Sequence, residues 1–415
     1  MRPALLGLAA LLCRADGFAV VGYIPDYRLG SVDWDVAVSS TTHLVLFSLQ
    51  PTADGGLEGF DRLGSFLRPS SGLNEALARL PDERRPKLLV TVGGAGRSQH
   101  YLQVASNKKA RKRLARRIGK LLQEQPRLAG VDLDWQAPES SEQWREFGRL
   151  AHEVRGALPE REERPLLTMT YHPRSGAVGV FSGMKGKRSE KGFVELFDLC
   201  HAMAYATFDN ERRHSTAAMD QAAVDEWLRH GLPARKLTLG VPFFGIERSS
   251  GQARAYGELL AREPSLAERR EVDNTKDGFY FVNAASMRQK LQLAARKGLA
   301  GVMIWELGQD ASSASGGSLL RDIGEARESL DSAWNRFLAW IPFGEDQVIV
   351  GLAALLGAYF LKETLLRSPP GHAFAVKASQ ASQANKANKA SQEKPEAAEA
   401  RAEAEAAAKP EGEAG

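Results

Sequence analysis

Residues 128–136 read Leu-Ala-Gly-Val-Asp-Leu-Asp-Trp-Gln, and this stretch decides the fold. The run begins like a buried strand and then places Asp132, Asp134 and Gln136 two residues apart. Because side chains alternate across a strand, residues spaced by two point to the same side. Two carboxylates and one carboxamide therefore lie on the same side of the strand. Such a polar row is not expected of a strand that serves only to pack a core. At the end of a strand in a parallel barrel, they would project into the site that loops build at the carboxyl-terminal mouth.

The surrounding chain repeats the same rhythm of short apolar runs and helix-like segments, which is typical of (β/α) architecture. Eight apolar runs can be counted: Val20–Ile24, His43–Leu49, Lys87–Val92, Ala129–Trp135, Leu166–Tyr171, Leu199–Tyr205, Leu237–Phe243 and Gly301–Leu307. Eight parallel strands over roughly 290 residues is the size of a (β/α)₈ TIM barrel. We therefore predict an α/β fold with one barrel domain over residues 20–335.

The seventh and eighth runs are separated by residues 246–298, which we expect to form only a short insertion. A helix, a short strand over Gly278–Phe281 and a helix over Ala284–Lys297 would use most of it.

Composition and charge fit a large barrel with extensions and do not indicate a nucleic-acid partner. The 415 residues are 43% hydrophobic and 26% charged, with a net charge of +4. The most basic segment, residues 107–124, has Leu114, Ile118, Leu121 and Leu122 at helical spacing. That spacing leaves the charges on the opposite face, so a solvated outer helix is the better interpretation.

Residues 1–19 have the pattern of a secretory signal peptide, with a charged start, a short apolar run, and small residues at Gly17 and Ala19. An additional buried helix is the alternative interpretation. Of the two cysteines, Cys13 falls in this segment and Cys200 remains, so the mature chain would have no partner for an internal disulfide. We expect the protein to enter the secretory pathway.

The chain after the barrel changes character. Residues 345–363 contain an apolar run that falls short of the roughly 20 residues of a full membrane span, although tilt can close that gap. Lys362 and Arg367 follow it and acidic residues precede it, an order that favours a single-pass anchor with the barrel outside the cytoplasm. The alternative is a packed C-terminal helix. Residues 367–415 lack an apolar period, and we expect them to be a disordered tail.

The stretch at residues 129–136 resembles the signature of glycoside hydrolase family 18, the chitinases and chitinase-like lectins, which reads Asp-Gly-x-Asp-x-Asp-Trp-Glu. Ala129 stands at the first Asp and Gln136 stands at the catalytic Glu. Other runs are similar to the family's strands in the same order: Gly22–Tyr27, Thr41–Ser48, Lys87–Gly94 with Thr91 for Ser, Met203–Ala206 with Ala206 for Asp, Leu239–Gly245 and Gly301–Asp310. Family members with a deep groove carry a larger α+β insertion before the last strand, so we expect a shallower, more open cleft here.

The resemblance implies a reaction in which the acetamido oxygen of the substrate itself attacks the anomeric carbon. Asp134 would orient and stabilise that acetamido group, Asp132 would support Asp134 electrostatically, and Tyr205 would form a hydrogen bond there. Trp305 would be the stacking floor beneath the sugar. The other residues expected to bind substrate are Met203, Tyr23 and Phe47, and neither a metal nor a cofactor is implied.

Gln136 leaves this site without the acid that the family signature provides. An amide cannot protonate the departing glycosidic oxygen, and losing a positioned acid lowers the rate by about 10²–10⁴, or roughly 3–5 kcal/mol of barrier. Glutamine is nevertheless nearly isosteric with glutamate, and its NH₂ group can donate a hydrogen bond. We therefore expect a chitinase-like, catalytically impaired protein that binds N-acetylglucosamine oligosaccharides or chitin.

Two alternatives remain open. The chain could retain residual or altered hydrolysis of β-1,4-linked N-acetylglucosamine if Glu139 or Glu306 served as the acid. Glu139 lies past Pro138, beyond the strand, and Glu306 alternates with Trp305 and is expected to point outward. The other alternative is a membrane-tethered scaffold for protein partners, because Ala129 and Ala206 weaken the sugar site.

Overall fold

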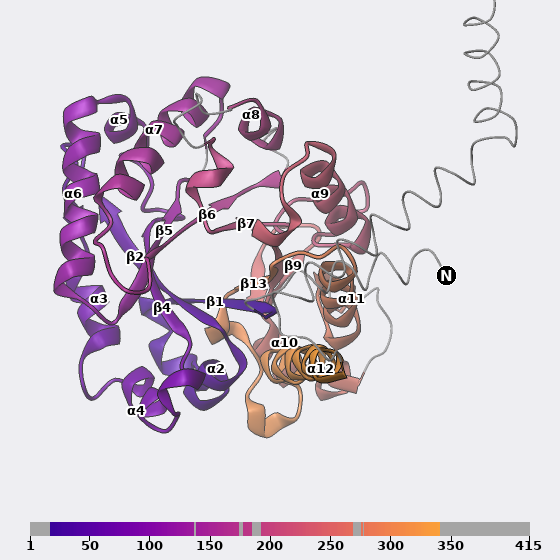
Figure 1. The fold of residues 1–415 in the computed structure, drawn as a ribbon. Coiled ribbons are helices and arrows are strands. Elements are labelled where there is room, and N and C mark those ends of the chain that lie inside the picture. The colour runs from indigo at the N-terminus through magenta and orange to yellow at the C-terminus, as the bar shows by residue number, and fades with distance from the viewer. Residues whose placement is uncertain are drawn as a thin grey trace, which may run out of the picture. The chain divides into compact units, whose positions relative to one another are not determined.

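The computed structural model describes residues 17–136, 138–173, 177–184, 192–268, 275–276 and 278–340. Its centre is a closed barrel of parallel strands in the order β1-β13-β8-β7-β6-β5-β4-β2, and the pairing of β1 with β2 completes the ring. Helices surround these strands (Figure 1). The predicted (β/α)₈ TIM barrel is confirmed.

The barrel strands match the eight predicted apolar runs, with differences at their ends. They are β1 (Ala19–Pro25), β2 (His43–Pro51), β4 (Lys87–Gly93), β5 (Leu128–Asp134), β6 (Leu166–Tyr171), β7 (Leu199–Ala202), β8 (Leu237–Pro242) and β13 (Gly301–Trp305). The prediction extended β7 through Tyr205, but the strand ends at Ala202. Met203 and Tyr205 therefore lie in the loop that follows β7.

The helices between the strands bury their apolar faces against the outside of the barrel. They include α2 (Trp34–Ser40), α3 (Phe60–Leu67), α4 (Gly72–Ala78), α5 (Tyr101–Ser106), α6 (Lys108–Glu124), α7 (Ser141–Ala157), α8 (Ala177–Gly183), α9 (Ala217–Arg229), α11 (Ala284–Arg296) and α12 (Leu319–Trp340). In α6, the Asn107 side chain accepts hydrogen bonds from the first-turn amides, and Leu114, Ile118 and Leu122 are buried. The basic residues of α6 lie mostly on its exposed face, as predicted for a solvated outer helix.

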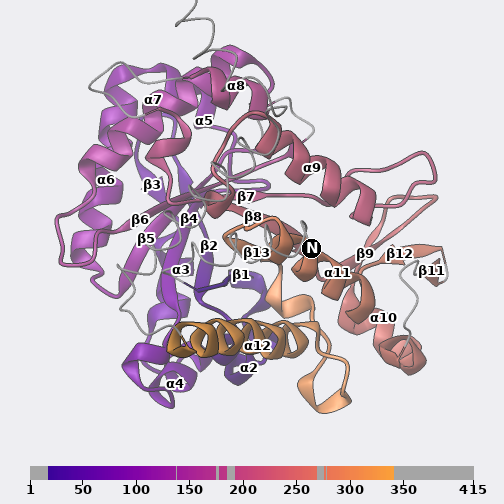
Figure 2. The ribbon, with the colours of Figure 1, turned by 45° about the vertical axis from the view of Figure 1, so that its right-hand side comes forward.

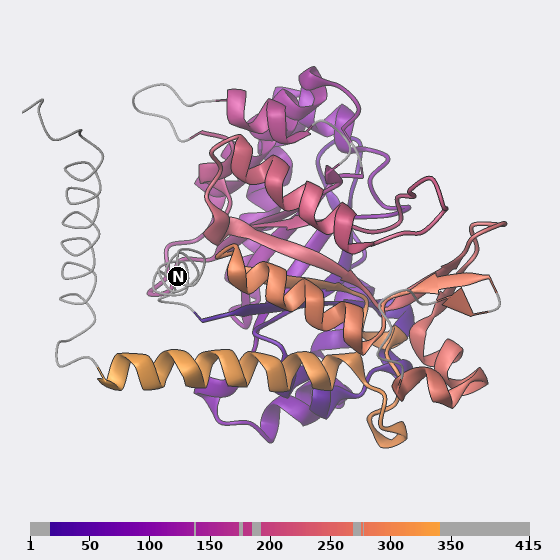
Figure 3. The same ribbon diagram turned by 90° about the vertical axis from the view of Figure 1, so that its right-hand side faces the viewer.

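Two apolar clusters divide the core. The larger lies between the strands and the surrounding helices, and it includes Leu319, Leu320 and Ile323 from the first turns of α12. Figure 3 shows α12 running alongside the barrel. Gly324 of α12 comes close to Ser40 of α2. The smaller cluster combines residues from the barrel strands with residues from the loops and insertion that follow them.

The insertion before β13 is more elaborate than the sequence predicted. It contains a four-stranded antiparallel sheet in the order β10-β9-β12-β11, together with α10 (Tyr256–Arg262) (Figure 2). The prediction gave this segment one helix, one short strand and a second helix, which correspond to α10, β12 (Phe279–Phe281) and α11. The strands missed are β9 (Phe244–Glu247), β10 (Ala253–Ala255) and β11 (Thr275–Lys276). They span two to four residues, which is too short for an alternating pattern to be recognised.

The predicted terminal segments lie largely or wholly outside the described residues. Of residues 1–19, only Gly17, Phe18 and Ala19 are described, and Phe18 is buried in the outer core. The predicted membrane segment 345–363 and tail 367–415 are not among the described residues. Within the described part of the chain, no helix is both long enough and apolar enough to cross a membrane.

Candidate functional site

Asp132 lies at the centre of a row of hydroxyl groups inside the barrel. The strand register places it beside Thr91 of β4 and Thr168 of β6. Its Oδ1 accepts a hydrogen bond from Thr168 Oγ1 at 2.7 Å, and its Oδ2 accepts from Tyr23 at 2.9 Å and from Thr91 at 3.2 Å. The side chain is completely buried. Three neutral donors therefore hold one carboxyl group in a fixed orientation.

Asp134 and Gln136 lie beside one another at the carboxyl end of β5. Gln136 Nε2 donates a hydrogen bond to Asp134 Oδ2 at 3.2 Å and contacts Met203 Sδ at 3.8 Å. Asp134 Oδ1 is buried and accepts no hydrogen bond of normal geometry from the described residues. Asp134 is 1% exposed, whereas Gln136 is partly exposed, so Gln136 is the member of the row that solvent reaches.

The environment of both carboxyl groups favours their neutral forms. Burial raises the pKa of Asp132 to about 6, and the hydroxyls of Thr168, Tyr23 and Thr91 oppose that shift. Burial also raises the pKa of Asp134 to about 7; the negative charge of Asp132 adds to the shift, while Thr170 and Gln136 oppose it. The Thr170 hydroxyl lies close enough to act on Asp134, although the pair does not reach normal hydrogen-bond geometry.

An aromatic wall encloses this polar row. Trp305, at the end of β13, is partly exposed, and its ring centroid lies 4.8 Å from that of Phe47 and 5.7 Å from that of Tyr23. Phe47, Tyr23, Met203 and Tyr205 belong to the smaller apolar cluster, and Trp305 packs against it. The Tyr205 hydroxyl contacts Met303 Sδ at 3.7 Å, and burial together with the nearby Asp134 raises its pKa. The structure thus brings all eight predicted site residues together.

Sequence reasoning gave no role to the residues that hold the polar row in place. Thr168 and Thr170 are spaced by two on β6, the same spacing as Asp132 and Asp134, and that repetition could have revealed them. Ser98 is a second example, because its Oγ bridges Gly94 to Asp134 O and accepts a hydrogen bond from Gln136 N at 3.3 Å. Ser98 lies in a loop, where no period marks it.

A tight turn after β4 allows the loop that contains Gly94 and Ser98 to approach the end of β5. Gly94 has φ +95°, and a Cβ atom there would meet the Phe47 ring at 2.1 Å. Its amide donates to Asp134 O at 2.7 Å. Only glycine permits both the backbone conformation and the close approach.

The two alternative acids lie apart from the polar row. Glu139 is exposed, and its backbone amide bonds to Gln143 at the start of α7. Glu306 was expected to point outward, but its side chain is 2% exposed. Its Oε2 accepts a hydrogen bond from Gly308 N at 2.9 Å, and its Oε1 lies 3.1 Å from Arg28 Nε. Burial raises the pKa of Glu306 to about 7, against the effect of Gly308 and Arg28.

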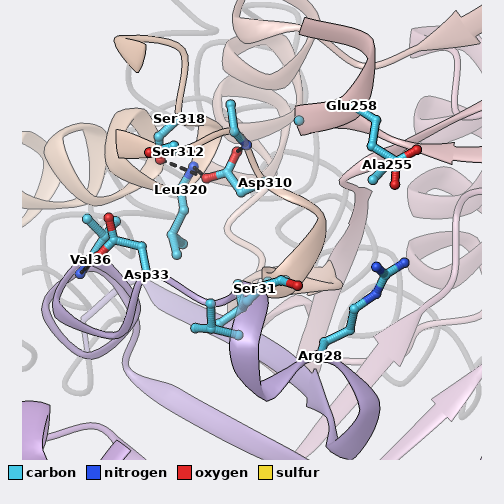
Figure 4. Close-up of a pocket in the computed structure, with 15 residues that line it drawn as sticks. Arg28, Ser31, Asp33, Val36, Ala255, Glu258, Asp310, Ser312, Ser318 and Leu320 are labelled. Atoms are coloured by element: carbon cyan, nitrogen blue, oxygen red, sulfur yellow. Dashed lines mark hydrogen bonds between the residues drawn. The ribbon is translucent and has the colours of Figure 1, made fainter. Parts of the chain in front are cut away.

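A cavity of about 320 Å³ is lined by a different set of residues (Figure 4). Its lining comes from the loops after β1 and β13, the start of α10 and the start of α12. None of the eight predicted residues lines it. Asp310, which faces it, is occupied as a cap for α12, because its carboxylate accepts from Ser318 Oγ and from the amides of Leu319 and Leu320. The polar row, rather than this cavity, is the candidate site.

A closed parallel barrel with two buried carboxyl groups and an amide at the end of one strand, beside an aromatic wall, defines a barrel of the glycosidase type. The chain belongs to the glycosyl hydrolases family 18, whose family model matches residues 19–310.

Its relatives include chitinases of fungi and plants. Chitinase 1 of Aphanocladium album is 22% identical over 383 residues, covering 78% of this chain and 88% of that protein. A class V chitinase of Arabidopsis thaliana is 24% identical over 283 residues, covering 55% of this chain and 70% of that protein.

Solved structures show the same fold. The family 18 chitinase ChiB of Flavobacterium johnsoniae superimposes with a TM-score of 0.56 at 21% identity, covering 76% of this chain and 96% of that chain. A mutant of the family 18 chitinase of Cycas revoluta, with a glutamate-to-glutamine change among its substitutions and (GlcNAc)₄ bound, superimposes with a TM-score of 0.56 at 20% identity, covering 74% of this chain and 99% of that chain.

Proposed function

We propose that this chain is a chitinase-like carbohydrate-binding protein that holds N-acetylglucosamine oligomers and hydrolyses them slowly or not at all. The observation that carries the proposal is Gln136, which stands at the position where the family signature has its catalytic Glu and donates a hydrogen bond to Asp134 Oδ2. An amide at this position can donate a hydrogen bond but cannot release a proton near neutral pH.

The rest of the site retains features that suit an acetamido sugar. Asp134 Oδ1 is a buried acceptor without a partner among the described residues, which suits the N–H of an acetamido group. Trp305 offers a partly exposed ring on which a sugar can stack. The Cycas revoluta mutant supports the same reading, since a family 18 chain with a glutamate-to-glutamine change carries (GlcNAc)₄.

Residual hydrolysis is a second candidate function, and one observation favours it. Glu306 has a pKa near 7, the value that a general acid needs at neutral pH, and it follows Trp305 directly. Its carboxylate is nevertheless engaged by Arg28 and Gly308, and neither interaction leads to the polar row.

Calorimetry of the full chain with (GlcNAc)₄ tests the proposal, with chromatography of the same samples to detect cleavage. We expect saturable binding and intact tetramer. The Trp305→Ala variant should bind more weakly, and Leu102→Ala, which changes an exposed apolar residue outside the site, should bind as the native chain does. Absence of binding, or rapid cleavage by the native chain, would overturn the proposal.

A further inference from the structure

The loop after β7 has an unusual backbone. Among the described residues, the non-glycine residues with positive φ are Ala206 at 54°, Arg212 at 56° and Ser215 at 57°. All three lie in the loop that begins after β7 ends at Ala202 and leads to α9. A left-handed conformation is disfavoured for residues that carry a Cβ atom, and it persists only where the surroundings impose it. Arg212 belongs to a local turn, in which Arg212 N donates to Asp209 O and Asp209 N donates to Arg213 O, whereas Ser215 is held by residues from outside this turn.

A buried network holds the end of this loop. Lys290 Nζ, from α11, donates hydrogen bonds to Asp220 Oδ2 of α9 at 2.5 Å and to Ser215 Oγ at 2.8 Å. Ser215 Oγ in turn donates to the carbonyl oxygen of Ala204 at 2.9 Å. All four residues are buried. The contacts thus connect α9 and α11, through Ser215, to Ala204, which lies between Met203 and Tyr205.

Stability alone does not account for such a network. Burial raises the pKa of Asp220 to about 6 and lowers that of Lys290, so for each group burial outweighs the attraction of its partner. Replacing a buried ion pair by apolar residues of similar volume is often neutral or stabilising. The ion pair is therefore weak evidence for stability, whereas its contact with Ser215 shows that it holds the end of the loop.

Ala204 occupies a sensitive position in the candidate site. Met203, on one side, accepts the contact from the Gln136 amide. Tyr205, on the other side, lies so close to β8 that a Cβ atom on Gly240 would come within 2.8 Å of its ring. Displacement of the Ala204 carbonyl would therefore move both neighbours relative to Asp134.

We propose that Lys290, Asp220 and Ser215 are positioning residues, which fix the strained loop so that Met203 and Tyr205 form the wall of the sugar site. The ligand of that site rests on the proposed function, whereas the positioning itself does not. The network acts through Ala204 and contacts no sugar.

The test compares two glycine variants of the full chain. Ser215→Gly removes the hydroxyl that links Lys290 to Ala204, but glycine suits the positive φ, so little loss of thermal stability is expected. Arg212→Gly makes the same backbone change in the same loop; the side chain that it removes contacts Arg248 O and the Phe208 ring but none of the network residues. The readouts are the ¹³C-methyl NMR signal of Met203, assigned with Met203→Leu, and calorimetric affinity for (GlcNAc)₄.

We expect Ser215→Gly to shift the Met203 signal and to weaken (GlcNAc)₄ binding roughly three- to tenfold, the effect of one hydrogen bond. Arg212→Gly should change neither. The apolar double variant Lys290→Met with Asp220→Leu should fold and should also shift the Met203 signal. A native Met203 signal in both network variants would overturn the proposal, as would equal changes in Ser215→Gly and Arg212→Gly. If the native chain bound no (GlcNAc)₄, the proposed function would fail and the NMR comparison would still decide the positioning role.

Discussion

Gln136 Nε2 donates a hydrogen bond to Asp134 Oδ2 at 3.2 Å, while Oδ1 of the same carboxyl group accepts none from the described residues. The amide thus stands beside a carboxyl group whose pKa is near 7, and it supplies a hydrogen bond without a transferable proton. The proposed function, binding without rapid turnover, depends on that pair.

Gln136→Glu should increase hydrolysis. The new carboxyl group would lie next to Asp134 and near Met203, in surroundings that favour its protonated form, and a positioned acid accelerates such reactions by about 10²–10⁴. We expect a rise of about 100-fold on an aryl chitobioside. The double variant Gln136→Glu with Asp134→Asn should lose that gain. Equal rates for the native chain and Gln136→Glu would mean that residue 136 is not at the acid position.

Asp134→Asn should stabilise the protein at alkaline pH. The folded-state pKa near 7 lies above the usual value of 3.8, so the group's favourable contribution is fully present below pH 4 and is lost as the pH rises to about 7. The buried charge then lowers the free energy of unfolding by up to about 4 kcal/mol. Urea unfolding should show little gain for the variant at pH 4, most of the gain by pH 6 and the full gain at pH 8. A gain that is the same at all three pH values would contradict the assigned cause.

Features that depend on one short stretch of sequence can be predicted from it, whereas contacts between distant segments cannot. The spacing of Asp132 and Asp134 survives in the structure because β5 fixes it locally, whereas Gln136 lies two residues beyond the strand and is held by Ser98 and Asp134. The hydroxyls that hold Asp132 come from β1, β4 and β6, and strand register, rather than any one segment, brings them together.

The loop after β7 shows where local patterns fail. Tyr205 continues an apolar run, so the sequence favours a longer strand, but the backbone leaves the sheet after Ala202. Lys290 likewise resembles a surface residue of a helix. Its burial follows from Asp220 and Ser215, which lie 70 and 75 residues away in the chain. The sequence around Asp220 and Ser215 shows no local pattern that indicates their contact with Lys290.

Ala206→Gly should stabilise the protein. Ala206 is exposed and has φ 54°, a conformation that is less favourable for alanine by about 1 kcal/mol and is freely available to glycine. Thermal unfolding should therefore show a higher midpoint. Ala222→Gly, at an exposed position in the interior of α9, serves as the control with the opposite sign, because glycine in a helix interior costs about 1 kcal/mol. A lower midpoint for Ala206→Gly would show that its side chain makes an interaction that outweighs the backbone strain.

Glu306→Gln should leave any residual hydrolysis unchanged. Glu306 is a candidate acid by its pKa, but its oxygens face Arg28 and Gly308, and its role in the structure is to cap the turn that follows β13. Glutamine keeps the shape and can still accept the Gly308 hydrogen bond, while Arg28, which is partly exposed, can turn to solvent. The rate on an aryl chitobioside should therefore stay within about twofold of the native rate, because the change removes no general acid, a group that accelerates such reactions by about 10²–10⁴.

Glu139→Gln, at an exposed position beyond β5, is the matched control for loss of a carboxylate. Abolished hydrolysis in Glu306→Gln with a native rate in Glu139→Gln would make Glu306 the proton donor and would replace the binding function by a glycosidase with a displaced acid.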